Sequence, residues 1–163
     1  RRSGELFGRG QFLPDADLSG SGFVANEPGG LWSALRWARR FGLPLYVLEN
    51  GIDDAADRIR PRYLALHLRE VWRAANFNWG LRGYFHCTIV DNLEWSQGWD
   101  QLFGIWELDP KTQTRRKRPS ADLYAEICRS NALSSEGVAR YAPEVLDRLF
   151  PGSRPKAMVL QRG

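Results

Sequence analysis

The sequence predicts an α/β fold that contains parallel strands. Two apolar runs, residues 43–48 and 83–90, have the composition of buried strands, and each is followed at once by a carboxylate, Glu49 after the first and Asp91 after the second. Apolar side chains at helical spacing lie between the runs, so the three segments form a strand–helix–strand unit. Ligands of parallel sheets and barrels bind at the carboxyl ends of the strands. An acidic residue at such an end is therefore a candidate for chemistry.

The segments before the first strand are predicted from their turn residues and their apolar spacing. Residues 1–30 are rich in Gly, Ser, Asp and Pro, which predicts a loop. Apolar residues recur at helical spacing from Leu31 to Phe41, with arginines on the other face, which predicts a helix. Gly42 ends this helix, and Pro44 leads into the first strand.

The second helix follows a long polar loop. Residues 53–60 form this loop, and Pro61 suits the first turn of the helix. One apolar stripe marks this helix: Leu64, Leu68, Val71, Trp72 and Ala75. His67 lies beside this stripe, and we interpret it as a partly buried structural histidine.

A loop, a third helix and a tail are predicted beyond the second strand. Residues 91–103 form an aromatic-rich loop, and residues 104–108 form a short extended piece. Pro119 opens the helix. Residues 131–163 form the tail, with one short amphipathic helix that ends at Pro151-Gly152. The last dozen residues are predicted to be unstructured.

Four motifs follow one another along the chain. They are Leu-Tyr-Val-Leu-Glu-Asn-Gly at residues 45–51, the run from Gly to Trp at residues 83–95, Phe-Gly-Ile with a later Asp at residues 103–109, and the helical segment 112–124. One motif alone would not suffice, because Glu-Asn-Gly also occurs in surface turns. In this order and spacing they resemble glycoside hydrolase family 1, the family of β-glucosidases and β-galactosidases. The resemblance covers roughly residues 23–130.

The resemblance implies a TIM (β/α)₈ barrel, an α/β fold that needs about 250 residues. The chain has 163 residues, and its motifs match the last two strands of the family barrel. We therefore expect a C-terminal fragment of a single barrel domain that has only the last two strands and their helices, and whose partner is the missing N-terminal half. In this reading residues 1–30 are loop, residues 31–130 are the barrel end, and residues 131–163 are the tail.

The resemblance also implies roles for individual residues. Glu49 matches the nucleophile of a retaining β-glycosidase, which forms a glycosyl–enzyme intermediate. Glu94 and Trp95 match the pair that binds the glycone, where a carboxylate accepts hydrogen bonds from sugar hydroxyls and an indole adds an N–H donor and an apolar face. Phe103 matches a wall of this pocket, and Cys87 stands at the position under the sugar ring. The implied substrate is a β-glucoside or β-galactoside, and two carboxylates suffice without a metal or an organic cofactor.

The acid/base glutamate of the family has no match at its expected place. The chain does contain Asn26-Glu27-Pro28, which resembles the end of the family's acid/base motif. Glu27 precedes Glu49 by only about twenty residues and leads directly into a helix, whereas the family separates its two glutamates by three strands. We therefore expect that Glu27 is not the acid and that the acid/base lies outside this chain.

Three positions depart from the family pattern. Leu48 replaces a threonine, Leu102 replaces an arginine, and Cys87 replaces a tryptophan that lies under the bound sugar. Because a tryptophan buries about 150–250 Å², its loss is expected to weaken sugar binding by roughly 2 kcal/mol. These departures leave a non-catalytic sugar-binding relative of the same barrel as the alternative to a hydrolase. The residues that select aglycone and linkage lie mostly outside the motifs.

Composition bears on partners and location. The net charge is +4, and one basic cluster, Arg115-Arg116-Lys117-Arg118, makes a nucleic-acid-binding module a third alternative. We interpret the cluster as a solvated loop and helix start, so no nucleic-acid partner is expected. Cys87 and Cys128 form neither a disulfide framework nor a metal-ligand spacing, which fits a reducing, cytoplasmic location. No apolar stretch reaches the roughly 18 residues of a membrane span, so no membrane partner is expected.

Overall fold

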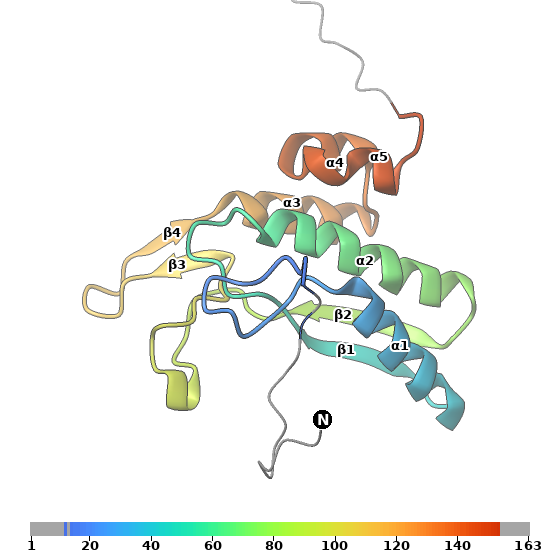
Figure 1. Ribbon diagram of the computed structural model, residues 1–163, viewed down its shortest axis with the longest axis horizontal. Helices are drawn as coiled ribbons and strands as arrows, with labels where there is room; N and C mark the ends of the chain where they lie inside the picture. The colour runs from blue at the N-terminus through green and yellow to red at the C-terminus, as the bar shows by residue number, and fades with distance from the viewer. Residues whose placement is uncertain (1–11, 13, 154–163) are drawn as a thin grey trace, which may run out of the picture.

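The structure, a computed structural model, describes residue 12 and residues 14–153 (Figure 1). Residues 1–11 and 13 of the loop predicted for residues 1–30, and most of the unstructured end predicted after residue 151, therefore lie outside the described residues. None of the helices in the described part is both long and apolar enough to cross a membrane.

The predicted strand–helix–strand unit is confirmed. Strand β1 (Leu45–Asn50) pairs with β2 (Leu81–His86) in parallel, and α2 (Arg60–Asn76) connects them. In the register of this pair Val47 lies opposite Tyr84, and Asn50 lies opposite His86. The last residues of the two strands therefore stand side by side at the same edge.

Helices cover one face of this strand pair. Leu35 of α1 (Pro28–Ala38), Val47 of β1 and Ala74 of α2 form the centre of a core that Leu45 and Tyr84 extend. Figure 1 shows both helices next to the strands. The alternation of side chains along a strand puts Leu45 and Val47 of β1 into this core.

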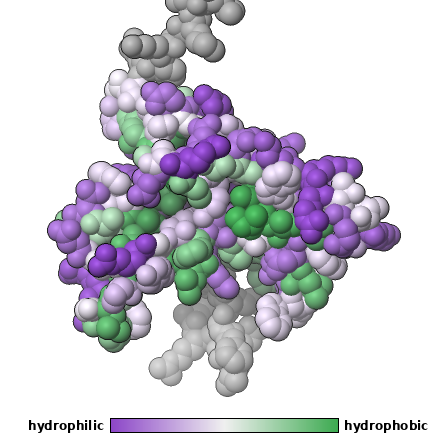
Figure 2. Space-filling model, turned by 180° about the vertical axis from the view of Figure 1, so that it is seen from behind, coloured by the Kyte–Doolittle hydropathy of each residue, from purple (hydrophilic) through white to green (hydrophobic). Residues whose placement is uncertain are grey.

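The other face of the strand pair stays open in the described part of the chain. Tyr46, Leu48 and Phe85 are 56, 65 and 54 % exposed. The apolar composition of both runs predicts strands that are buried on both sides, and this holds for only one side here. Apolar patches also interrupt the polar surface in Figure 2, which views the molecule from behind.

Local signals explain where the first helices begin and end. Helix α1 begins at Pro28, a residue suited to a first turn, so the predicted loop ends earlier than residue 30. A 3₁₀ turn (Arg39–Phe41) continues it to Gly42, whose φ of 66° permits the left-handed stop that the sequence predicts. In α2, His67 is only 4 % exposed, so it is more deeply buried than expected.

A hairpin joins the second strand to the third helix. Strand β3 (Trp106–Leu108) lies within the predicted extended piece and pairs antiparallel with β4 (Arg115–Lys117), which the sequence does not predict. Helix α3 (Pro119–Ser130) begins at the expected proline. The prediction of a solvated loop at residues 115–118 is therefore wrong. Residues 115–117 form an exposed strand, and Arg118 is buried.

The tail contains more helix than the single one predicted. Helix α4 (Ser135–Tyr141), a 3₁₀ turn (Pro143–Val145) and α5 (Leu146–Leu149) follow α3, and Figure 1 shows them stacked beyond α2 and α3. The Ser134 hydroxyl caps α4 by accepting a hydrogen bond from the Gly137 N–H at 3.0 Å. The tail packs on α2 through a core formed by Ala65, Leu66, Val138, Ala142, Val145 and Leu146.

Candidate active site

Glu49 is exposed near the carboxyl end of β1, where the chain passes close to β2. Gly51, two residues after Glu49 and directly after β1, has no room for a side chain, because a Cβ there would lie 1.6 Å from the carbonyl oxygen of Cys87. The Cys87 N–H donates to the carbonyl of Asn50 at 3.1 Å. Glycine is therefore required at residue 51 for the two strand ends to meet.

Cys87 lies beside both predicted sugar-site glutamates. Burial raises the pKa of its thiol, and the negative charges of Glu94 and Glu49 raise that pKa further. The two carboxylates therefore share one electrostatic neighbourhood around Cys87. The peptide bond between Cys87 and Thr88 is cis.

Phe103 reaches the same edge through backbone hydrogen bonds. Its carbonyl accepts from the Thr88 N–H at 3.2 Å, and the Thr88 carbonyl accepts from the Ile105 N–H at 3.0 Å. Phe103 therefore lies next to the segment that carries Cys87. Trp95, at the start of a 3₁₀ turn (Trp95–Gln97), is 93 % exposed and points into solvent in this structure. Four of the five predicted site residues are thus gathered at one edge, and Trp95 stands at its rim.

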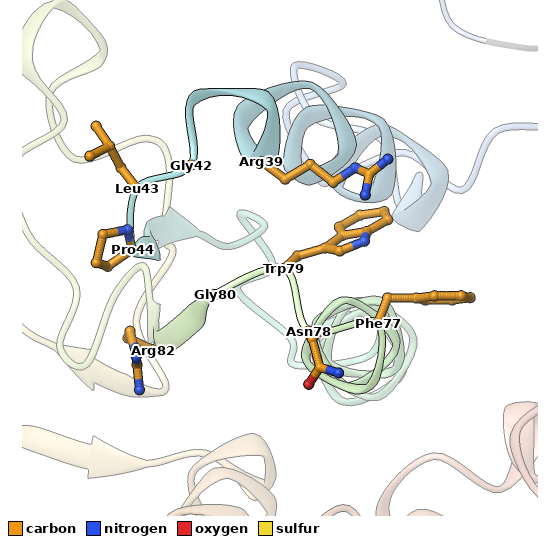
Figure 3. Close-up of a pocket in the computed structure, with 9 residues that line it drawn as sticks. All are labelled: Arg39, Gly42, Leu43, Pro44, Phe77, Asn78, Trp79, Gly80 and Arg82. Carbon is orange, nitrogen blue, oxygen red and sulfur yellow. The ribbon is translucent and has the colours of Figure 1, made fainter.

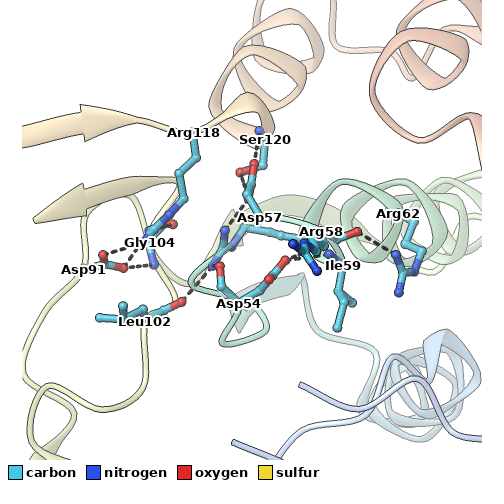
Figure 4. Close-up of polar contacts among 11 residues, drawn as sticks. Asp54, Asp57, Arg58, Ile59, Arg62, Asp91, Leu102, Gly104, Arg118 and Ser120 are labelled. Atoms are coloured by element: carbon cyan, nitrogen blue, oxygen red, sulfur yellow. Dashed lines mark hydrogen bonds and ion pairs between the residues drawn. The ribbon is translucent and has the colours of Figure 1, made fainter. Parts of the chain in front are cut away.

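Asp91, which the sequence predicts to end the second strand, lies five residues beyond the end of β2 at His86 and has a structural role. It is 2 % exposed and accepts two hydrogen bonds from Arg118, at 3.0 and 2.9 Å. It also accepts from the Gly104 N–H at 2.8 Å, and Arg118 donates to the Gly104 carbonyl at 2.6 Å (Figure 4). This cluster fixes the loop before β3. Of the two carboxylates that the sequence places at strand ends, only Glu49 therefore remains a candidate for chemistry.

A second buried cluster fixes the loop that follows β1. Arg60, with no exposed surface, forms an ion pair with Asp57 and donates to the carbonyls of Asp54 and Leu102 at 2.7 and 2.8 Å. Asp57 also accepts from the backbone and the hydroxyl of Ser120, both at 2.7 Å (Figure 4). The cluster joins the β1 loop, the loop before β3 and the start of α3, all on the side of Glu49. Sequence reasoning missed it, although Asp and Arg three residues apart at a helix start were a visible signal.

Two cavities in the described residues lie away from Glu49. One of about 310 Å³ lies at the amino ends of β1 and β2, and Figure 3 shows Arg39 over the Trp79 ring while Arg82 points elsewhere. The Arg39 guanidinium is 4.9 Å from the ring centre. The other cavity, of about 650 Å³, lies between α2, β2, α3 and α5. Neither cavity is lined by Glu49, which is exposed at the end of β1.

Glu27 is exposed immediately before α1, in the helix layer. It does not stand at the end of a strand. Its place agrees with the expectation that it belongs to the entry of a helix, and its exclusion as the acid stays a prediction.

Comparison with known proteins gives one consistent family. The sequence model of glycosyl hydrolase family 1 matches residues 11–133. The β-galactosidase of Sulfolobus acidocaldarius is 45 % identical over 125 residues, which are 76 % of this chain and 25 % of that protein. The β-galactosidase of Saccharolobus solfataricus is 40 % identical over the same shares. The chain therefore spans about a quarter of the length of these curated relatives.

Solved structures agree with the sequence matches. The β-glycosidase from Pyrococcus horikoshii has a TM-score of 0.74 at 36 % identity, over 80 % of this chain and 31 % of that one. The β-glucosidase from Pyrococcus furiosus has a TM-score of 0.72 at 35 % identity, over 79 % of this chain and 27 % of that one. The α/β arrangement described here thus corresponds to one part of these larger glycosidases.

Proposed function

Since the chain belongs to glycosyl hydrolase family 1, we propose that it supplies the nucleophile, Glu49, of a retaining β-glycosidase. Further barrel strands, which the relatives have and this chain does not match, complete the active site. In this arrangement β1 and β2 are the last two strands of the barrel. The open face with Tyr46, Leu48 and Phe85 turns to the barrel interior.

The reaction follows from the position of two carboxyl groups. The Glu49 carboxylate attacks the anomeric carbon while a second carboxyl protonates the departing glycosidic oxygen, and water then cleaves the glycosyl ester. A retaining enzyme holds the two groups about 5–5.5 Å apart. The second carboxyl comes from the unmatched part of the barrel and not from Glu27. The position of Glu49 at a strand end, where β1 and Gly51 restrict the backbone, supports the role of nucleophile.

The neighbours of Glu49 suit a sugar. The Glu94 carboxylate accepts hydrogen bonds from glycone hydroxyls, Trp95 closes over the ring from the rim, and Phe103 forms a wall. Cys87 lies under the ring and contributes less apolar surface than an indole would. The activities of the relatives, β-galactosidase and β-glucosidase, support a β-galactoside or β-glucoside as the substrate.

One observation carries this proposal: the exposed Glu49 lies at the carboxyl end of β1, where the hydrogen bond from the Cys87 N–H to the Asn50 carbonyl joins that strand end to the segment after β2. The Cys87 carbonyl leaves no room for a side chain at Gly51, so the backbone just after Glu49 is closely held. A carboxylate that served only solubility would not need such a rigid attachment. The arrangement supports chemistry at an edge that the rest of a barrel would enclose.

A chimera tests the proposal. Residues 12–163 replace the 125-residue stretch of the S. acidocaldarius β-galactosidase that this chain matches. We expect hydrolysis of aryl β-galactosides or β-glucosides, its loss in Glu49→Gly, and rescue of that variant by azide with a glycosyl azide of inverted configuration. Glu27→Gly is the matched control and should retain activity.

Three outcomes separate the alternatives. Full activity in Glu49→Gly, or a deeper loss in Glu27→Gly, would refute the assignment of the nucleophile. A folded chimera that binds a sugar lactam without any turnover would favour the non-catalytic sugar-binding relative. Turnover by the unjoined 163-residue chain, abolished by Glu49→Gln, would show that no further barrel strands are needed.

A further inference from the structure

We infer that Asn50 is a positioning residue for Glu49: its side-chain amide is locked by Tyr63, His67 and Tyr84, and this lock fixes the strand end from which the Glu49 carboxylate projects. The inference rests on the proposed role of Glu49. It adds residues from α2 and β2 to those that position the nucleophile. Asn50 itself is the last residue of β1.

The amide of Asn50 uses both of its donors and its acceptor. Its Nδ2 donates to the Tyr63 hydroxyl at 2.9 Å and to Nδ1 of His67 at 3.1 Å. Its Oδ1 accepts from the Tyr84 hydroxyl at 2.9 Å. A primary amide has two N–H donors and one carbonyl oxygen, so each kind of group has a partner. Rotation of the amide by 180° would break this pattern.

The pattern also sets the state of His67. An NH₂ group can only donate, so Nδ1 of His67 must accept, and the ring is neutral with its proton on Nε2. Burial supports this state, because it lowers the pKa of His67 to about 4. The rings of Tyr63 and His67 stack with centroids 3.8 Å apart, and their exposed fractions are 3 and 4 %. The lock is therefore uncharged and rigid.

The backbone transmits the lock to Glu49. The carbonyl of Asn50 accepts from the Cys87 N–H at 3.1 Å, so the strand end is held from the helix layer by its side chain and from β2 by its main chain. The regular alternation that places Leu45 and Val47 in the core is interrupted by a register shift between Val47 and Asn50, so Glu49 is exposed while the Asn50 side chain contacts α2. Fixing Asn50 on the covered face therefore directs Glu49 to the open face. A displacement of about 1 Å at a reacting group can cost roughly a hundredfold in rate.

A spectroscopic measurement on the 163-residue chain tests the lock directly. The chain has two histidines, so imidazole ¹⁵N resonances are few, and His67→Gln assigns them. We expect a neutral His67 with the proton on Nε2 and a hydrogen-bonded Nδ1, and we expect that Nδ1 signal to shift in Asn50→Asp. A proton on Nδ1 of His67 would overturn the inference, because Asn50 could not then donate to it.

Kinetics of the chimera test positioning against a purely structural role. Tyr63→Phe keeps the ring stack and removes the hydroxyl, and we expect kcat to fall roughly tenfold with KM nearly unchanged. Tyr141→Phe is the matched control, because it removes a hydroxyl that donates to Glu126 at 3.3 Å, far along the chain in α4. It should change neither constant.

The variants also separate this inference from the proposed function. If Glu49→Gly leaves activity intact, the role of Glu49 is wrong. If Glu49→Gly abolishes activity while Tyr63→Phe lowers only the melting temperature, the lock is structural and the positioning inference is wrong. The tautomer measurement needs no activity, so the lock can be refuted even in a chimera that fails to turn over.

Discussion

Replacing Arg118 with methionine should lower the free energy of unfolding of the chain by about 3 kcal/mol. The Arg118 side chain is 6 % exposed, and both of its terminal nitrogens contact Asp91, whose side chain has no exposed surface. Removing the guanidinium leaves a buried carboxylate without its charge partner, which costs about 3–5 kcal/mol. The N–H groups of Gly104 and Leu108 still donate to Asp91, so we expect the lower end of that range.

Urea unfolding of the 163-residue chain, followed by tryptophan fluorescence, measures this loss. A loss of about 3 kcal/mol moves the midpoint by roughly 1–3 M urea at the slopes usual for small proteins. The control is Arg116→Met, since Arg116 is 75 % exposed and 3.7 Å from Glu107, and it should change stability by less than about 0.5 kcal/mol. Adding Asp91→Asn to Arg118→Met should recover part of the loss by removing the unpaired charge. Equal midpoints for the two arginine variants would refute the structural role of the pair.

Three further predictions concern the strand ends and the buried imidazoles. Gly51→Ala should cost about 1–3 kcal/mol in urea unfolding, because its Cβ would meet Cys87, whereas Gly29→Ala, in open helical space, should stabilise by up to about 1 kcal/mol; equal effects would contradict this. His67 and His86 have folded-state pKa values of about 4 through burial, below the ordinary 6.5, so the unfolded chain binds more protons between these values. Stability should therefore fall by roughly 2 kcal/mol per imidazole from pH 7 to pH 5, and a flat profile of unfolding free energy would refute it. Cys87→Trp in the chimera should bind a neutral sugar lactam about five- to thirty-fold more tightly in competitive inhibition, and unchanged affinity with unchanged melting would show that Cys87 does not face the sugar.

The strand–helix–strand unit could be predicted because its signals are local. Apolar runs, the helical stripe and the stop at Gly42 each act over a few residues, and parallel pairing then follows from the length of the connection. The second strand of the β3–β4 hairpin could not, because three exposed basic residues carry no apolar alternation. Their strand conformation comes from pairing with β3.

The roles of charged residues were harder to predict than the elements. Asp91 and Glu49 both follow apolar runs, and the sequence does not distinguish the one that meets a buried arginine from the one that stays exposed. Arg118 lies in a basic cluster whose other members are exposed, and only its distance to Asp91 in the fold shows that it turns inward. Contacts 27 residues apart in the chain are set by the tertiary structure.

The site itself was predicted through motifs and not through physical patterning. Order and spacing led to Glu49, Glu94 and Cys87, which the structure brings together. The lock on Asn50 was not predicted, because Glu-Asn-Gly suggests a turn, while His67 suggests only a buried side chain. Their hydrogen bond joins β1 to the middle of α2.

Covalent trapping tests the role of Glu49 most directly. The chimera is incubated with a 2-deoxy-2-fluoro β-glycoside that has a good leaving group, since slow breakdown of the glycosyl ester lets the intermediate accumulate. Intact mass should rise by one fluoroglycosyl unit, and peptide mapping should place that unit on Glu49, with no label in Glu49→Gln. A label on another carboxylate, or continued turnover without any label, would contradict the proposed function.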